Sequence, residues 1–167
     1  MSDERSGVKV FHRKNTLKMK AGGGAGDGPG FLDPNRVARG QFAIDEQEEN
    51  YANEAEIVLL KIDSAWEDLK DSETPEDEKR NLSNLYNYAN NLKDIAKTFD
   101  YDLMSYFGNS LCDFCDQIDI RKEEHHVIVK AHIDVMWAAY KTNLKEEFGE
   151  EAEQLKKMLD QAISKHS

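Results

Sequence analysis

The chain of 167 residues is long enough for one domain with an apolar core and short for two. A third of the residues are charged and the net charge is −11, so the folded part should repel phosphate backbones, and nucleic acid is not expected as its partner. The longest apolar stretches, 57–60 and 135–140, are too short to span a bilayer, and residues 1–20 lack the apolar core of a secretory signal. We therefore expect a cytoplasmic protein with no membrane partner.

The N-terminal part differs from the rest in charge and composition. Residues 1–40 hold eight Lys/Arg against four Asp/Glu, a net charge of +4, whereas residues 41–167 hold fourteen against twenty-nine, a net charge of −15. Residues 21–30, AGGGAGDGPG, contain six glycines and a proline, and this backbone entropy opposes both helix and strand. We predict a flexible, basic tail and linker over 1–40 and a helical bundle domain over 41–167. The tail is open to three roles: a second contact to an acidic partner, folding back on the body, or a solvated arm.

The first part of the body reads as two amphipathic helices. From about residue 44, apolar residues recur every three or four positions up to Leu69, which is the pattern of one helix face. A second helix is predicted to begin after Thr74, which can accept a capping hydrogen bond. Pro75 suits the first helical position, and the three acids that follow suit the positive end of the helix dipole. Apolar residues continue on one face of this helix to Phe99.

Three further helices are predicted. One follows FDYD, with apolar residues from Leu103 to Ile118 on one face; the next follows DIRKEE; the last begins at about 144 and includes Phe148 on its apolar face. No segment of useful length alternates with period two, so no sheet is expected. Because short connections between long helices make antiparallel neighbours, the predicted fold is all-α, an antiparallel up-and-down bundle of four to five helices.

Residues 88–108, YANNLKDIAKTFDYDLMSYFG, carry a family resemblance. The order Ala89, Asn90, Asn91, Leu92, Lys93, Asp94 and then IAKTFD is similar to A-H-x-L-K-G-x-x-x-x-F-G, the pattern on the second helix of histidine-containing phosphotransfer (Hpt) domains. The following helix also resembles the third helix of these domains. The resemblance implies a four-helix bundle core over about 45–145 and a place in two-component signalling. The matching residues are Ala89, Leu92, Lys93, Phe99, Leu103, Leu111 and Cys112.

Three departures from the pattern change what the resemblance implies. Asn90 stands at the position of the phosphate-accepting histidine, and an amide nitrogen is not a nucleophile at neutral pH. Asp94 replaces the first glycine and places a carboxylate at the implied docking point, which would weaken or redirect docking to a regulator whose own pocket is lined with acids. Asp100 replaces the second glycine, where we expect it to cap the third helix.

The resemblance therefore implies a protein that binds a response regulator or a kinase receiver domain without phosphotransfer. The expected partner-binding residues share one flank of the second predicted helix, at steps of three and four residues. These residues are Tyr86, Asn90, Lys93, Asp94 and Lys97.

Two alternatives stay open. The chain could be an active phosphorelay carrier that uses His126 as its phosphoacceptor, with Lys130 four residues on and on the same helix face. It could also be an unrelated helical adaptor or structural bundle that associates with itself or another helical protein through Trp66, Trp137 and nearby apolar residues.

No catalytic constellation, metal site or cofactor is predicted. Cys112 and Cys115 form a lone CDFC with no βαβ pattern around it, and zinc would also need His125 and His126, which point about 100° apart on a helix. The thiols are expected to be buried instead. His132 is expected to be a partly buried, hydrogen-bonded imidazole with no serine or cysteine nucleophile arranged with it.

Overall fold

The computed structural model describes residues 34–166; residues 1–33 and Ser167 lie outside the described part. Within 34–166 the chain forms five helices and no strand: α2 (Pro34–Lys70), α3 (Pro75–Thr98), α4 (Asp102–Cys115), α5 (Glu123–Lys141) and α6 (Glu150–His166). The predicted all-α class is confirmed. The chain divides into two units, Met1–Asp45 and Glu46–Ser167. The predicted Gly-rich linker lies outside the described residues, and the predicted domain boundary at residue 40 stays a prediction.

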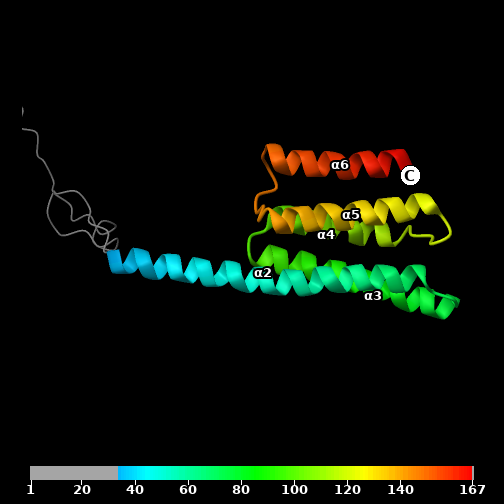
Figure 1. The fold of residues 1–167 in the computed structure, drawn as a ribbon, viewed down its shortest axis with the longest axis horizontal. Coiled ribbons are helices and arrows are strands. Elements are labelled where there is room, and N and C mark those ends of the chain that lie inside the picture. The colour runs from blue at the N-terminus through cyan, green and yellow to red at the C-terminus, as the bar shows by residue number, and fades with distance from the viewer. Residues whose placement is uncertain (1–33, 167) are drawn as a thin grey trace, which may run out of the picture. The chain divides into compact units, whose positions relative to one another are not determined.

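The second unit is an antiparallel up-and-down bundle, whose successive helices reverse direction (Figure 1). Fully buried side chains from four helices form its core, among them Leu59, Leu85, Phe107 and Ile133. α6 lies beside α5 in Figure 1 and contributes only two buried side chains, Ala152 and Leu159. The core is therefore built mainly by α2 to α5.

α2 begins at Pro34, earlier than the predicted start near residue 44. Proline is well suited to a first helical position because its missing N–H would lack a partner there in any case. In these early turns the Arg39 guanidinium donates to the backbone carbonyl of Asn35 (3.2 Å), and the Gln41 amide donates to the Asp45 carboxylate (2.7 Å). Residues 34–45 are exposed, so apolar periodicity carries no signal of this helical start.

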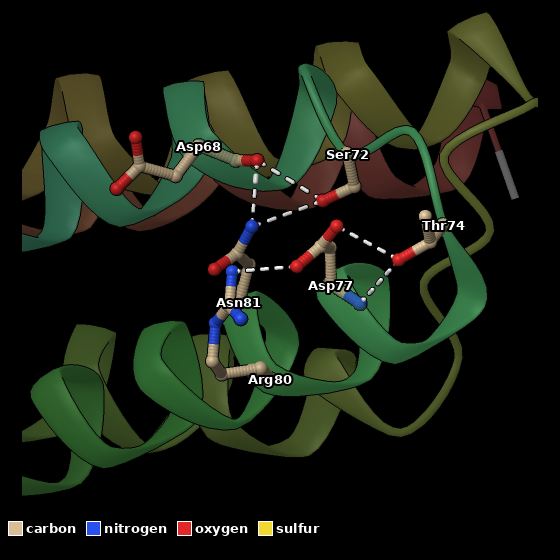
Figure 2. Close-up of polar contacts among 6 residues, drawn as sticks. All are labelled: Asp68, Ser72, Thr74, Asp77, Arg80 and Asn81. Carbon is tan, nitrogen blue, oxygen red and sulfur yellow. Dashed lines mark hydrogen bonds and ion pairs between the residues drawn. The ribbon is translucent and has the colours of Figure 1, made fainter.

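The predicted start of α3 is confirmed, and hydrogen bonds from its first turns hold both the cap and the end of α2 (Figure 2). The Thr74 hydroxyl accepts the Asp77 N–H (3.1 Å) and donates to the Asp77 carboxylate (2.7 Å). This hydrogen bond from Thr74 is the main reason that the pKa of the Asp77 carboxyl is lowered. One turn on, the buried Asn81 amide donates to the Asp68 carbonyl (2.8 Å) and to the Ser72 hydroxyl (3.0 Å). The tight α2–α3 turn is thus held by side-chain hydrogen bonds on both sides.

Two predicted helix boundaries are wrong. α6 begins at Glu150 and not near 144, because Gly149 before it has a φ of 126°, a conformation that breaks a helix. Phe148 therefore lies in the α5–α6 loop, 76% exposed, and not on an apolar helix face. α4 ends at Cys115, which leaves Ile118 in the following loop.

Candidate docking surface on α3

The five predicted partner-binding residues, here called the α3 flank, are centred on a polar cluster. The Asn90 side-chain oxygen accepts from the Lys93 ammonium (2.7 Å), and its NH₂ donates to the Asp94 carboxylate (3.3 Å). Lys93 and Asp94 also form an ion pair at 4.0 Å, with side chains 27% and 64% exposed. The neighbouring Ala89 and Leu92 are fully buried. The amide thus bridges a cation and an anion at the surface of α3.

Four of the five residues lie together and the fifth lies apart. Lys97 joins the cluster because Lys93, Asp94 and Lys97 line one side of a surface hollow of about 470 Å³. The other side of this hollow comes from α4 and the α5–α6 loop. Tyr86, 42% exposed, instead lines a separate hollow of about 390 Å³ near the end of α4. The first hollow is also lined by Asp102 and Tyr106 of α4 and by Glu147 of the α5–α6 loop.

Gly108 brings α4 against the α3 flank and was not identified from the sequence. A Cβ atom at Gly108 would lie 3.1 Å from Lys93 Cβ, 3.2 Å from the Lys93 backbone nitrogen and 3.2 Å from the Ala89 carbonyl oxygen. These contacts are tighter than ordinary packing, so the two helices approach this closely because residue 108 has no side chain. A single glycine inside an apolar helical pattern is the sequence signal that could have found it.

Asp100 does not cap α4, contrary to expectation. The N-cap of α4 is Tyr101, which makes no side-chain capping hydrogen bond. Asp100 has a φ of 60°, the left-handed conformation that reverses the chain after α3, and aspartate tolerates this conformation better than most residues. After the turn, the Tyr101 N–H donates to the Ala96 carbonyl (2.8 Å). Asp100 therefore serves the α3–α4 turn through its backbone.

His126, the alternative phosphoacceptor, serves the packing of the α4–α5 loop. Its Nε2 lies 2.7 Å from the Ile120 carbonyl oxygen, and its ring packs edge-on against Trp66 with 5.2 Å between centroids. Lys130, expected to assist it, is paired with the Asp134 carboxylate. The Nε2 atom of His126 is thus engaged in a hydrogen bond that holds the loop.

His132 is fully buried and, contrary to expectation, has a serine beside it. Its Nδ1 lies 2.8 Å from the Ile128 carbonyl, which can only accept, so Nδ1 donates. Its Nε2 then accepts from the Ser110 hydroxyl at 3.0 Å. Burial lowers the pKa of His132, which keeps the ring neutral. This hydrogen bond ties α4 to α5, and the imidazole itself has no exposed surface.

The two cysteines and the two tryptophans contribute to the core. Cys112 and Cys115 are free and buried, and burial raises the pKa of both thiols, that of Cys115 to about 12. Trp66 is 3% exposed, so it cannot form the self-association surface considered above. The Trp137 indole donates to the Asp63 carboxylate (2.8 Å). Within residues 34–166, no group of three or more His, Cys, Asp or Glu side chains could hold a metal ion.

The chain matches no protein-family model, no curated protein and no solved structure. None of the helices in the described part is both long and apolar enough to cross a bilayer. The local chemistry of the α3 flank is therefore the basis on which a function can be argued.

Proposed function

We propose that this protein binds a response regulator or a kinase receiver domain through the α3 flank and accepts no phosphoryl group. The observation that carries the proposal is the agreement between the phosphotransfer pattern and the local structure of α3. Ala89 and Leu92, at the pattern's small and apolar positions, are fully buried, while Asn90, at the acceptor position, reaches the surface cluster. Asp100, at the second glycine position, has the positive φ that favours glycine.

A binding role without transfer follows from the chemistry of Asn90. The nitrogen of an amide has its lone pair delocalised into the carbonyl, so it cannot attack a phosphoryl group at neutral pH. Its hydrogen bonds are also satisfied, one to Lys93 and one to Asp94. The nearest thiol by sequence on α4, Cys112, is buried with a raised pKa and supplies no replacement nucleophile. The flank retains groups that can recognise a partner and lacks the group that would react.

The charges of the flank favour electrostatic recognition of modest strength. Lys93 and Lys97 can offset the acids of a receiver domain, whereas Asp94 opposes them. Because Asp94 and Lys97 are exposed, salt should screen these interactions within about 10 Å at 0.1 M ionic strength. The affinity should therefore fall as the salt concentration is raised.

The test is direct binding of the full chain to a panel of purified receiver domains from the source organism, measured by calorimetry. Lys93→Glu should reduce the affinity for the recognised receiver at least tenfold, because it places like charge against the receiver's acids. Lys157→Glu on α6 makes the same change in charge at an exposed site outside the flank and should leave the affinity unchanged. Circular dichroism of both variants checks that the fold is retained. Binding by no receiver domain would refute the proposal.

The absence of transfer is tested with the same partners. A receiver carrying radiolabelled phosphate should pass no label to the wild-type chain. Transfer that is abolished in His126→Gln would replace this proposal by the active-carrier alternative.

A further inference from the structure

Phe148 is the most exposed of the large apolar side chains in the described part of the chain, at 76%. It lies in the α5–α6 loop, between Asn143, with a φ of 51°, and Gly149, with a φ of 126°. Burial of an aromatic ring in a partner is a large source of binding energy, so an exposed ring becomes significant when it is held in place.

The ring is held by a shielded lysine. The Lys156 side chain is only 13% exposed, and its ammonium lies 5.3 Å from the ring centroid of Phe148 and 4.9 Å from that of Tyr106 on α4. The same ammonium pairs with Glu147 at 3.1 Å and with Glu153 at 3.5 Å. The Lys156 ammonium of α6 thus restrains the Phe148 ring on one side. A ring fixed before binding loses less conformational entropy when a partner covers it.

The Phe148 loop and the α3 flank adjoin the same hollow. Lys93, Asp94 and Lys97 line it from α3, and Glu147, the residue before Phe148, lines it from the α5–α6 loop. Tyr106 contributes both to the hollow and to the site of the Lys156 ammonium. A partner that covers the α3 flank and the hollow therefore reaches the neighbourhood of Phe148.

The surroundings of Phe148 are acidic. Glu146, Glu150 and Glu151 are exposed, and none of them forms an ion pair with another described residue. The nearby cations are already paired, Lys145 with Glu48 and Lys156 with Glu147 and Glu153. Charge complementarity thus calls for basic side chains on whatever covers the ring.

We propose that Phe148 is a second anchor of the docking surface and inserts into an apolar pocket rimmed by Lys or Arg on the bound receiver domain. This inference rests on the proposed function and adds a requirement to it. The partner must present such a basic-rimmed pocket beside the surface that contacts Asn90 and Lys93. The carboxylates around Phe148 would also select against receiver domains whose corresponding face is acidic.

The test uses the full chain and the receiver domain recognised in the binding panel. Phe148→Ala should weaken binding at least tenfold and leave circular dichroism and the unfolding midpoint close to wild type, because the ring is mostly exposed. Met158→Ala removes a 60% exposed apolar side chain from α6 and serves as the matched control, with unchanged affinity expected. Phe148→Trp should retain binding. The double variant Glu150→Lys, Glu151→Lys should slow association with the basic-rimmed pocket.

The outcomes separate the two proposals. If Lys93→Glu abolishes binding and Phe148→Ala binds like wild type, the proposal that Phe148 is an anchor is wrong and the proposed function stands. If no receiver domain binds, both fail. Self-association that is lost in Phe148→Ala, measured by analytical ultracentrifugation in the absence of a receiver, would assign the ring to a second copy of this chain and overturn the receiver pocket.

Discussion

Tyr51 on α2 offers a sharp test of the packing, through removal of a single oxygen atom. Its ring is 2% exposed and stacks on Tyr101, with centroids 3.5 Å apart and planes inclined by 13°. Its hydroxyl is buried, and no hydrogen-bond partner for it lies among the described residues. Burial is also the main reason that the pKa of the Tyr51 phenol is raised, so the group stays neutral. The substitution Tyr51→Phe removes only this hydroxyl.

The expected magnitude follows from the state of the hydroxyl before and after folding. In the unfolded chain water satisfies it, whereas in the folded chain it loses water without gaining a partner. Burying such a group costs about 1–3 kcal/mol in proteins. The void left by one oxygen is small, so its penalty offsets little of the gain. We expect Tyr51→Phe to raise the free energy of unfolding by about 1 kcal/mol, which is an increase of roughly 2–4 °C in the unfolding midpoint.

The assay is urea unfolding followed by circular dichroism, with Tyr101→Phe as the matched control. The Tyr101 hydroxyl donates to the Asn143 side chain at 2.8 Å, so its removal should lower the free energy of unfolding by about 1 kcal/mol. Removal of the hydroxyl from each of the two stacked rings should therefore change the free energy of unfolding in opposite directions. A loss of stability in Tyr51→Phe, with an unchanged dependence on urea, would show that the Tyr51 hydroxyl has a partner and would refute the reasoning.

Three further predictions concern the interhelical contacts. Asn81→Asp removes both donated hydrogen bonds and sets a carboxylate oxygen against the Asp68 carbonyl, so it should lower the free energy of unfolding by about 2–4 kcal/mol in urea unfolding, whereas the same change at the neighbouring Asn84 should cost less than half of this. Gly108→Val should cost about 1–3 kcal/mol, since a Cβ added at residue 108 would crowd Lys93, and a neutral result would mean that α3 and α4 can separate freely. The lowered pKa of His132 means that the unfolded chain binds more protons, so its contribution to stability is present above about pH 6.5 and is lost as the pH falls through the folded-state pKa. Between about pH 7.5 and about pH 5 the free energy of unfolding should fall less in His132→Gln than in wild type. An equal fall in both would contradict the role given to His132.

The elements that could be predicted are those with local signals. Thr74 and Pro75 mark the start of α3 because capping and a fixed proline φ act within one turn. The apolar faces of α3 and α4 follow from periodicity, and Leu92 is fully buried as that periodicity requires. The same periodicity wrongly placed Phe148 on the apolar face of α6. An apolar residue just before a helix fits the spacing of that face, although Gly149 separates it from the helix.

The site was predictable only where its residues are neighbours on one helix. Asn90, Lys93 and Asp94 meet because steps of three and four residues bring side chains together on any α-helix. The hydrogen bond between Ser110 and His132 joins residues on different helices, 22 positions apart. Such a contact depends on how the helices are packed, and neither the spacing nor the composition of one segment contains that information.

On the proposed function, the presence of Asn90 where the phosphotransfer pattern has a histidine has a consequence for regulation. A histidine would titrate near neutral pH, and its phosphorylation would add negative charge to the flank. The amide of Asn90 is neutral at every physiological pH, and Lys93 and Asp94 on either side of it carry opposite charges. Asn90 therefore adds no charge of its own to the α3 flank. On the proposed function, the Asn90 amide takes up no phosphate, so a response of this flank to phosphorylation would come from different affinities for the two forms of the receiver domain.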